Sequence, residues 1–421
     1  MSSRYAILVF LCLGQLTAGL TWYNYSAVLP LLQKDWSLSG AQAGIILSAF
    51  QAGYVIAVVT LGFLSDRIGG RKVFVISAIE TSLAGLSFAI FAKGFFSATV
   101  LRVLAGLGQG GLYVPGMKLL SQWFPPKERG KALGIYTSAL IGSYAGALYI
   151  AAPIASAYSW QWAIILTSVW GLLGAALVFF FVKERAELKV VAGNSGAPLS
   201  VSRTPLKKAI LMGKPLGLLN LGYMSHMWEL YGFYGWVGPF VVAVALGHGF
   251  SDDSALVYGN TIAATAVLMG IVSPALGGFI SDKIGRTRTI IMVILVSAAC
   301  SFSVGWLIAI PLYWFLGIIL VYGFFVVMES AVFKAGLSEL VEPEYLGSAL
   351  GVQSFLGFGI TILSPALFGL VLDISAPGVE GQSLVWGWSF GLLGLGALVG
   401  PVSMYFLRRL PESVRIGDGK K

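Results

Sequence analysis

Apolar segments long enough to cross a lipid bilayer recur along this sequence, and they restrict its fold more than any other feature. A helix that spans a bilayer needs about 20 mostly apolar residues. Three such segments are AGIILSAFQAGYVIAVVTLGFL, WAIILTSVWGLLGAALVFFFV and SFGLLGLGALVGPVSMYFL. Hydrophobic residues make up 57% of the chain and charged residues 11%, whereas a soluble domain carries about 25% charged residues. The sequence therefore predicts an all-α protein whose helices cross a membrane many times.

Polar breaks divide the sequence into twelve predicted spans. They cover residues 5–32, 41–64, 73–93, 97–121, 131–156, 160–182, 215–244, 255–280, 289–309, 311–336, 347–373 and 384–407. The N-terminal stretch resembles a secretory signal peptide, but it continues apolar through Leu32, so we predict an uncleaved first span.

The distribution of basic residues predicts the orientation of these spans. If the N-terminus is cytoplasmic, 22 of the 27 Lys and Arg residues fall in segments on the cytoplasmic side. These segments are residue 4 and the ranges 65–72, 127–131, 183–214, 283–288 and 408–421. Such asymmetry follows the positive-inside rule, so we predict a protein of the plasma membrane (the inner membrane of a bacterium or archaeon) with both termini cytoplasmic. The formal net charge of +9 is then a topological signal and does not indicate nucleic-acid binding.

The residues that usually carry catalysis or bind metals are scarce. Cys12 and Cys300 lie in apolar spans, and His226 and His248 are the only histidines. This set provides neither a disulfide framework nor a typical zinc site. The sequence also lacks the Gly-x-x-x-x-Gly-Lys-Ser/Thr loop that ATP-driven transport would need. We therefore predict no metal, no cofactor and no enzymatic activity, and we expect a monomer in the lipid bilayer.

A polar phrase occurs twice in this apolar chain, about half a chain apart. The stretch GFLSDRIG at residues 62–69 matches GFISDKIG at residues 278–285, an offset of 216. A second pair, ERGKALG at 128–134 and YLGSALG at 345–351, has an offset of 217. Two stretches at nearly one offset indicate a duplicated unit of six spans.

The duplication predicts two six-helix bundles joined by a linker. Residues 183–209 are basic, contain Gly, Ser and Pro, and lack a long apolar run. The predicted parts are an N-terminal bundle (1–182), a cytoplasmic linker (183–214), a C-terminal bundle (215–410) and a cytoplasmic tail (411–421).

The repeated phrase resembles a known family signature. The loop at residues 62–72 is similar to the signature between spans two and three of the major facilitator superfamily, although Gly70 stands where that family more often has a basic residue. Residues 101–111, LRVLAGLGQGG, resemble the fourth-span signature of the same family. The resemblance, twelve spans and a duplication imply a secondary transporter that works by alternating access between two bundles. The Gly-x-Gly-x-x-Gly spacing at 106–111 is not a dinucleotide site, because it lies inside an apolar span.

The repeated phrase also predicts a latch. Each copy carries an acidic residue just past a span, where a helix N-terminus of the opposite half could supply partial positive charge. The resemblance implies that these turns hold the two halves together when the cytoplasmic side is closed. The predicted latch residues are Asp66, Arg67, Gly69, Arg71, Lys72, Asp282, Lys283, Gly285, Arg286 and Arg288. In the alternative interpretation these charges only set the topology.

Polar residues inside the spans are candidates for a solute cavity, since charge at membrane depth is costly and usually faces a cavity or a partner. Arg102 is a candidate for binding Asn24, the carbonyls of span one, the solute, or a combination of these. Lys334 is a second cavity cation, with snorkelling towards the cytoplasm as the alternative. The predicted cavity residues are Tyr23, Asn24, Arg102, Gln109, Tyr113, His226, Tyr231 and Lys334.

Three side chains are candidates for proton coupling. His226 and Glu229 are three residues apart in span seven, so they can share a helix face. Glu329 in span ten is the third candidate. Imidazole and a buried carboxyl can both exchange a proton near neutral pH. A hydrogen-bonded structural pair is the alternative, and for Glu80 in span three a structural role is the favoured one.

These observations favour a secondary transporter of a small polar solute. The cations at Arg102 and Lys334 point to a small organic or inorganic anion, with protons as a candidate coupling ion. The alternative is a proton-driven exporter of hydrophobic or drug-like compounds, but span one has no carboxylate of the kind such exporters often use. A membrane sensor that kept the fold without transporting is a further class.

Overall fold

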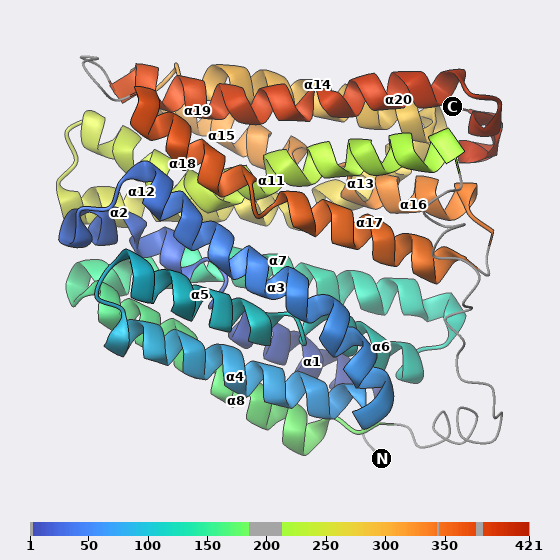
Figure 1. Cartoon of the computed structure of the whole chain (residues 1–421), viewed down its shortest axis with the longest axis horizontal. Coiled ribbons are helices and arrows are strands. Elements are labelled where there is room, and N and C mark those ends of the chain that lie inside the picture. The colour runs from blue at the N-terminus through green and yellow to red at the C-terminus, as the bar shows by residue number, and fades with distance from the viewer. Residues whose placement is uncertain (1–2, 185–212, 343–344, 376–381, 421) are drawn as a thin grey trace. The chain divides into compact units, whose positions relative to one another are not determined.

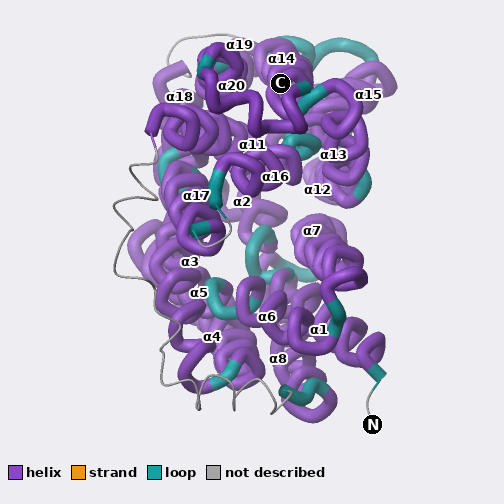
Figure 2. The backbone as a smooth tube through the Cα atoms, turned by 90° about the vertical axis from the view of Figure 1, so that its right-hand side faces the viewer, coloured by secondary structure: helices purple, strands orange, loops and turns teal. Residues whose placement is uncertain are grey.

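The protein is helical throughout the residues that its structure, a computed structural model, describes. These residues are 3–184, 213–342, 345–375 and 382–420, and they contain no strand (Figure 2). Within them, twelve helical segments are long and apolar enough to cross a membrane. The predicted fold class and the predicted number of spans are therefore confirmed. Most of the predicted linker lies outside the described residues.

The chain divides into two compact units, which we describe separately. Unit 1 comprises residues 1–198 and 237–264, and unit 2 comprises 199–236 and 265–421. The predicted boundaries at 182, 214 and 410 stay predictions.

The helices of unit 1 follow one another with short connections (Figure 1). They are α1 (Arg4–Gly19), α2 (Asn24–Trp36), α3 (Gly40–Ile68), α4 (Gly70–Phe91), α5 (Phe95–Gln109), α6 (Tyr113–Trp123), α7 (Pro126–Ala157) and α8 (Trp160–Phe181). Helix α5 packs between α3 and α4, and α1 packs against α7 and α8. Two further helices, α11 (Gly213–Gly247) and α12 (Asp252–Leu268), each have residues in both units.

The remaining elements belong to unit 2. They are η1 (Met269–Ile271), α13 (Ser273–Ile284), α14 (Arg286–Val304), α15 (Leu312–Phe325), α16 (Ser330–Leu340), α17 (Leu346–Ile360), α18 (Ser364–Ser375), α19 (Gln382–Ala397), α20 (Val399–Arg409) and η2 (Pro411–Gly419). Helix α14 is central to this unit, since it packs against α15, α19 and α20.

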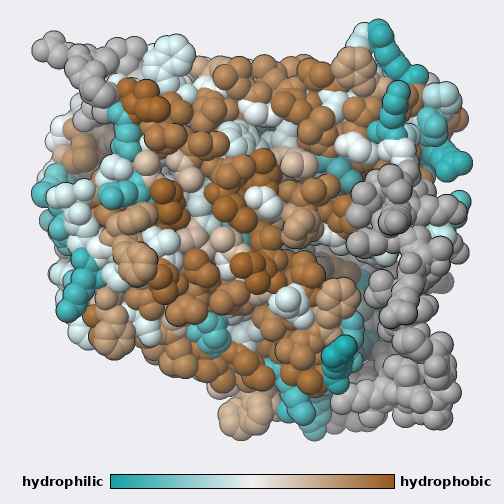
Figure 3. Space-filling view, viewed as in Figure 1, coloured by the Kyte–Doolittle hydropathy of each residue, from teal (hydrophilic) through white to brown (hydrophobic). Residues whose placement is uncertain are grey.

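Large apolar side chains remain exposed on both units, as expected for a surface that faces lipid. Figure 3 shows such side chains over most of the visible face. Ile76, Leu83 and Ile90 on α4 are 59%, 52% and 61% exposed, and Met292 on α14 is 58% exposed. In water these patches would favour aggregation, whereas in a bilayer they contact acyl chains.

Several predicted spans are not continuous helices. Span one is broken between α1 and α2, span four between α5 and α6, and span ten between α15 and α16. Spans four and ten occupy corresponding positions in the two predicted halves. Interrupted helices at corresponding positions are typical of substrate sites in transporters, because the breaks expose helix ends and unpaired backbone groups at membrane depth.

Candidate functional site

The break in span one is held by a buried arginine from span four. Arg102 on α5 donates from Nη1 to the carbonyl oxygen of Thr21 and from Nη2 to that of Trp22, both at 2.8 Å. These two residues lie between α1 and α2, where carbonyl groups lack helical partners. The guanidinium group therefore replaces the missing backbone hydrogen bonds and places a positive charge near the C-terminal end of α1, where a cation is favoured.

Aromatic rings complete the surroundings of this guanidinium group. Its carbon lies 4.3 Å from the ring centroid of Phe50 and 5.5 Å from that of Tyr25, and Arg102 is only 4% exposed. Among the predicted alternatives, the structure thus shows the one in which Arg102 binds the carbonyls of span one. Asn24 does not pair with it and donates to Thr167 Oγ1 at 3.0 Å.

The other predicted cavity residues of unit 1 lie around the same breaks. Gln109 is 1% exposed at the end of α5. Tyr113 lies beyond the break, at the start of α6, where its hydroxyl bonds to Thr137 Oγ1 at 2.8 Å. Tyr23 packs in an aromatic cluster with Trp22 and Tyr144. Because span four is broken, Arg102 and Gln109 on α5 and Tyr113 on α6 do not lie on one continuous helix.

In unit 2, the break in span ten brings a carboxylate to a histidine of span seven. Glu329 is the residue immediately before α16, and its Oε1 lies 2.8 Å from Nδ1 of His226 on α11. The other ring nitrogen, Nε2, lies 2.6 Å from the hydroxyl of Ser330. The side chains of His226 and Glu329 are both fully buried.

The contacts of the His226 ring allow hydrogen bonds in either direction. The Ser330 hydroxyl can donate to a neutral imidazole or accept from a protonated one. Glu329 Oε1 can likewise accept from an imidazole N–H or share a proton with it. The other oxygen, Oε2, is buried without a hydrogen-bond partner among the described residues. A buried charged oxygen without a hydrogen bond is costly.

Glu229 has partners of its own and does not bond to His226. Its Oε1 accepts from Ser301 at 2.7 Å and its Oε2 from Ser297 at 2.8 Å, and both serines lie on α14. Ser301 in turn contacts the hydroxyl of Tyr322. The sequence placed His226 and Glu229 on one face of span seven, but each side chain bonds to a different neighbouring helix. Glu229 therefore belongs to a network with α14, whereas one oxygen of Glu329 has no hydrogen-bond partner among the residues described.

The last two predicted cavity residues are placed differently from each other. Tyr231 on α11 is 6% exposed and packs edge-on against Phe358, with 5.8 Å between the ring centroids. Lys334 is exposed on α16, one helical turn beyond Ser330. No group of three or more His, Cys, Asp or Glu side chains able to hold a metal ion occurs among the described residues.

Comparison with known proteins identifies the family. The family model described as Major Facilitator Superfamily matches residues 11–365. The chain belongs to the major facilitator superfamily. It is therefore an integral membrane transporter of a small-molecule solute and not an enzyme.

Individual members of the superfamily match most of the chain. A hexuronate transporter of Bacillus subtilis is 28% identical over 387 residues, 87% of each chain. A probable sulfoacetate transporter of Cupriavidus necator is 24% identical over 420 residues, 94% of this chain and 93% of its own length. The solved structure of a D-xylose-proton symporter, 18% identical, covers 98% of this chain and 99% of its own with a TM-score of 0.76. This structural likeness supports the fold.

The two copies of the superfamily's signature turn have the same backbone. Gly69 ends α3 with φ +99° and ψ 144°, and Gly285 ends α13 with φ +99° and ψ 152°. Residues with a side chain rarely adopt such a positive φ, so each copy requires its glycine. This equivalence is what the predicted duplication implies.

In the first copy, the partners of the signature residues come from outside the signature. Asp66 forms an ion pair with Lys118 of α6. Glu184, just past α8, accepts from the backbone N–H of Arg71 at 3.1 Å, and Arg71 Nη1 donates to the carbonyl oxygen of Val182 at 3.2 Å. The sequence analysis did not assign Lys118 or Glu184 to this site. Lys118 reaches Asp66 from α6, the part of span four beyond its break.

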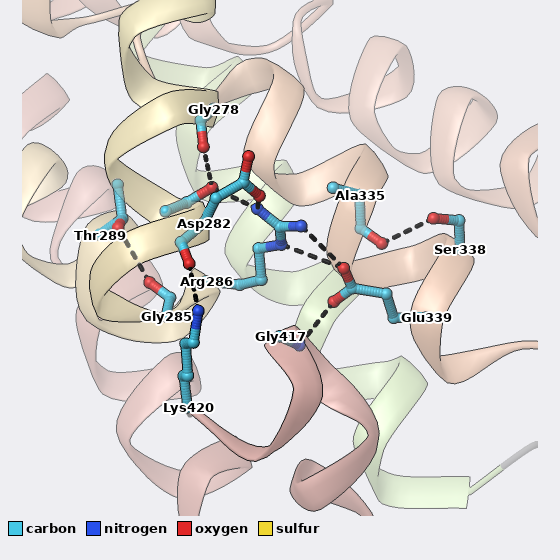
Figure 4. A network of polar contacts seen from close by, with 11 residues as sticks. Gly278, Asp282, Gly285, Arg286, Thr289, Ala335, Ser338, Glu339, Gly417 and Lys420 are labelled. Carbon is cyan, nitrogen blue, oxygen red and sulfur yellow. Dashed lines mark hydrogen bonds and ion pairs between the residues drawn. The ribbon is translucent and has the colours of Figure 1, made fainter.

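In the second copy, the C-terminal segment joins the network (Figure 4). Arg286 contacts Asp282, and its Nη2 lies 2.9 Å from Oε1 of Glu339 on α16. The backbone N–H of Gly417 donates to the other oxygen of Glu339 at 2.8 Å. Lys420 Nζ donates to the carbonyl oxygen of Asp282 at 2.7 Å. Glu339 and the tail are further members of this site that sequence reasoning missed.

Four basic residues remain exposed beside the two turns, namely Arg67, Lys72, Lys283 and Arg288. Lys283 lies 4.2 Å from the ring centroid of Phe279. Asp66 and Arg71 in the first copy, and Asp282 and Arg286 in the second, thus have partners within their own unit. These four further basic residues are available at the surface of the turns.

Removal of the chain after Leu410 is expected to loosen the second signature turn. The truncation removes the Gly417 and Lys420 donors and Ile416, which is 1% exposed. Loss of about 1.4 kcal/mol in local stability would speed amide hydrogen exchange about tenfold at residues 281–288. Hydrogen–deuterium exchange with mass spectrometry measures this change.

The matched control for the truncation is Arg415→Ala, which changes an exposed residue of the same segment. It should leave exchange at residues 281–288 unchanged. Equal exchange rates in the truncated and full-length chains would contradict a role of the tail in this turn.

Proposed function

We propose that this protein is a proton-coupled symporter of a small organic anion. It lies in the plasma membrane with both termini in the cytoplasm and works by alternating access. The observation that carries the proposal is the buried pair of His226 and Glu329 beside the break in span ten. A titratable pair at the N-terminal end of a half-helix can couple one proton to one nearby negative charge.

The coupling follows from the charge of the pair. Without the extra proton, a neutral His226 and an ionised Glu329 carry a net charge of −1, and with it they carry none. An anion about 5 Å away is repelled by about 3 kcal/mol in the first state, at an effective dielectric constant of 20. Proton and anion therefore favour each other's binding by the same factor.

Two features supply positive charge for the anion. Helix α16 begins at Ser330, and its N-terminus carries partial positive charge. Lys334 is exposed one turn further along this helix. The relatives named above support the choice of solute, since hexuronate and sulfoacetate are both small organic anions. Arg102 instead stabilises the break in span one, because both terminal nitrogens of its guanidinium group donate to carbonyl oxygens there.

We further propose that the two signature turns form a latch between the two halves of the protein. Within each unit, Asp66 and Asp282 are held in place by Lys118 and Arg286. The exposed basic side chains beside them are then available to contact the opposite half when the cytoplasmic side closes. Release of these contacts would open that side.

The function is tested by a thermal-shift screen of the purified protein. Galacturonate or another small organic anion is expected to raise the unfolding temperature, whereas galactose, which lacks the carboxylate, should not. Lys334→Gln should weaken anion binding about tenfold, equivalent to about 1.4 kcal/mol. Lys93→Gln, at an exposed lysine of unit 1, is the matched control.

Two outcomes would contradict the proposed function. Stabilisation by lipophilic cations and not by anions would favour an exporter of hydrophobic compounds. Equal anion affinity in Lys334→Gln and the unchanged protein would remove Lys334 from the site.

A further inference from the structure

A groove on unit 1 contains a carboxyl group that the proposed transport mechanism does not use. The groove runs between α4 and α5 and has a volume of about 390 Å³. Its walls are mostly apolar and include Ile79, Leu83 and Leu104. Only two polar side chains line it, Glu80 and Ser87.

The carboxyl group of Glu80 packs against the backbone of α5, where Gly108 leaves room for it. A Cβ atom added to Gly108 would lie 1.7 Å from Oε2 of Glu80. Any larger residue at position 108 would therefore occupy the place of the carboxyl group. This close approach also gives a structural role to Gly108, within the glycine-rich stretch that resembles a dinucleotide fingerprint.

Glu80 has no ion-pair partner within the part of the chain that the structure describes. Its Oε2 is buried without a hydrogen-bond partner among the described residues. The ion pairs that the structure describes involve other acidic residues. The backbone of Gly108 gives this carboxyl group a hydrogen bond, but an ionised carboxylate without a counter-charge in apolar surroundings is still unfavourable, so a cation from outside the chain would stabilise it.

The groove opens towards the lipid phase. Glu80 is the eleventh of the 22 residues of α4, a membrane-spanning helix, which places it at the middle of the span. Ile79, Leu83 and Leu104 beside it are 39%, 52% and 41% exposed. Exposed apolar side chains at this depth contact acyl chains, so a ligand reaches Glu80 from within the bilayer and needs no aqueous path.

We propose that this groove is a lateral binding site for lipophilic amines. The ammonium group pairs with Glu80, and the alkyl chain lies against the apolar wall formed by Ile79, Leu83 and Leu104. Ser87 follows Glu80 by seven residues, two helical turns, and so faces the same side of α4 as a second polar contact. Binding here is separate from solute transport through the site at Glu329.

A hydrophobic carbodiimide tests both the accessibility and the charge of Glu80. The carboxylic acid adds across one C=N bond of dicyclohexylcarbodiimide. A carbon–oxygen bond forms, and the acid proton moves to nitrogen without a leaving group. The reagent partitions into lipid and reacts with the protonated acid, so the full-length protein in lipid vesicles should be modified at Glu80. Mass spectrometry of the peptide that contains Glu80 measures the rate.

Competition then identifies the ligand class. N,N-Dimethyldodecylamine, a tertiary amine that cannot form an amide with the activated carboxyl group, should slow the modification of Glu80 at least tenfold, because it occupies the groove and pairs with the carboxylate. Dodecan-1-ol has the same chain without the amine, and it should slow the reaction less than twofold. Equal protection by the amine and the alcohol, or no adduct at Glu80, would overturn the proposal.

A variant separates this site from transport. Glu80→Gln should lose the rise in unfolding temperature that N,N-dimethyldodecylamine gives the unchanged protein, while solute uptake continues at the unchanged rate. The competition experiment uses only the unchanged protein, so it remains decisive if the variant folds poorly. Retained amine binding in Glu80→Gln would contradict the role of Glu80, and loss of uptake in this variant would contradict the separation of the two sites.

Discussion

Replacement of Glu329 by Gln is expected to abolish proton-driven accumulation of the solute while exchange of solute across the membrane continues. The amide cannot ionise, so the pair with His226 no longer changes charge when a proton arrives. The coupling of about 3 kcal/mol estimated for this site corresponds to about 100-fold in anion affinity between the two protonation states, and the variant loses this difference. The measurement is uptake into vesicles with and without an imposed pH gradient, beside counterflow at equal pH.

Glu229→Gln is the matched control, because Glu229 is also a fully buried carboxyl on the same unit. Its hydrogen bonds to Ser297 and Ser301 place it in a network separate from His226. Accumulation in this variant should keep its dependence on the pH gradient. If the gradient drives accumulation in Glu329→Gln as in the unchanged protein, the pair is not the proton carrier. Loss of coupling in Glu229→Gln alone would transfer that role to Glu229.

Replacement of Arg102 by Met is expected to destabilise unit 1 more than other single changes at basic residues. Two hydrogen bonds from a charged group, each about 2 kcal/mol, are lost, and the carbonyl groups of Thr21 and Trp22 lose these donors. The contact with the ring of Phe50 is lost as well. A loss of about 4 kcal/mol corresponds to a fall of about 10 °C in the unfolding temperature. Thermal unfolding in detergent, followed by intrinsic fluorescence, measures it.

Two further variants make this result specific. Arg102→Lys keeps the charge but not the two-pronged geometry. Its unfolding temperature should therefore lie between those of Arg102→Met and the unchanged protein. Arg67→Met removes an exposed arginine of the same unit and should change the unfolding temperature by less than about 2 °C. If Arg102→Met and Arg67→Met behave alike, the guanidinium group does not hold the break in span one.

The partners of the signature turns show where sequence reasoning reaches its limit. The sequence identified Asp66, Gly69 and their copies, because the motif is contiguous and its glycines are required by the backbone at each turn. It did not identify Lys118 or Glu339, which lie 52 and 57 residues further along the chain from these aspartates. Their contribution depends on the direction in which α6 and α16 leave the breaks in spans four and ten. No local pattern in the sequence encodes that direction.

The sequence by itself determined the twelve spans, the duplication and the family, because transfer of apolar side chains into lipid depends on composition along the chain. It also restricted the binding partners of Arg102 to a few alternatives, since a charge at membrane depth needs a partner or a cavity. Only the tertiary structure decided which partner each buried polar group has. His226 bonds to Glu329, which is 103 residues away, and Glu229 bonds to serines of α14. The physical reason is that such pairs form between helices, so they depend on the rotation of each helix and on the position of each break, which tertiary packing fixes.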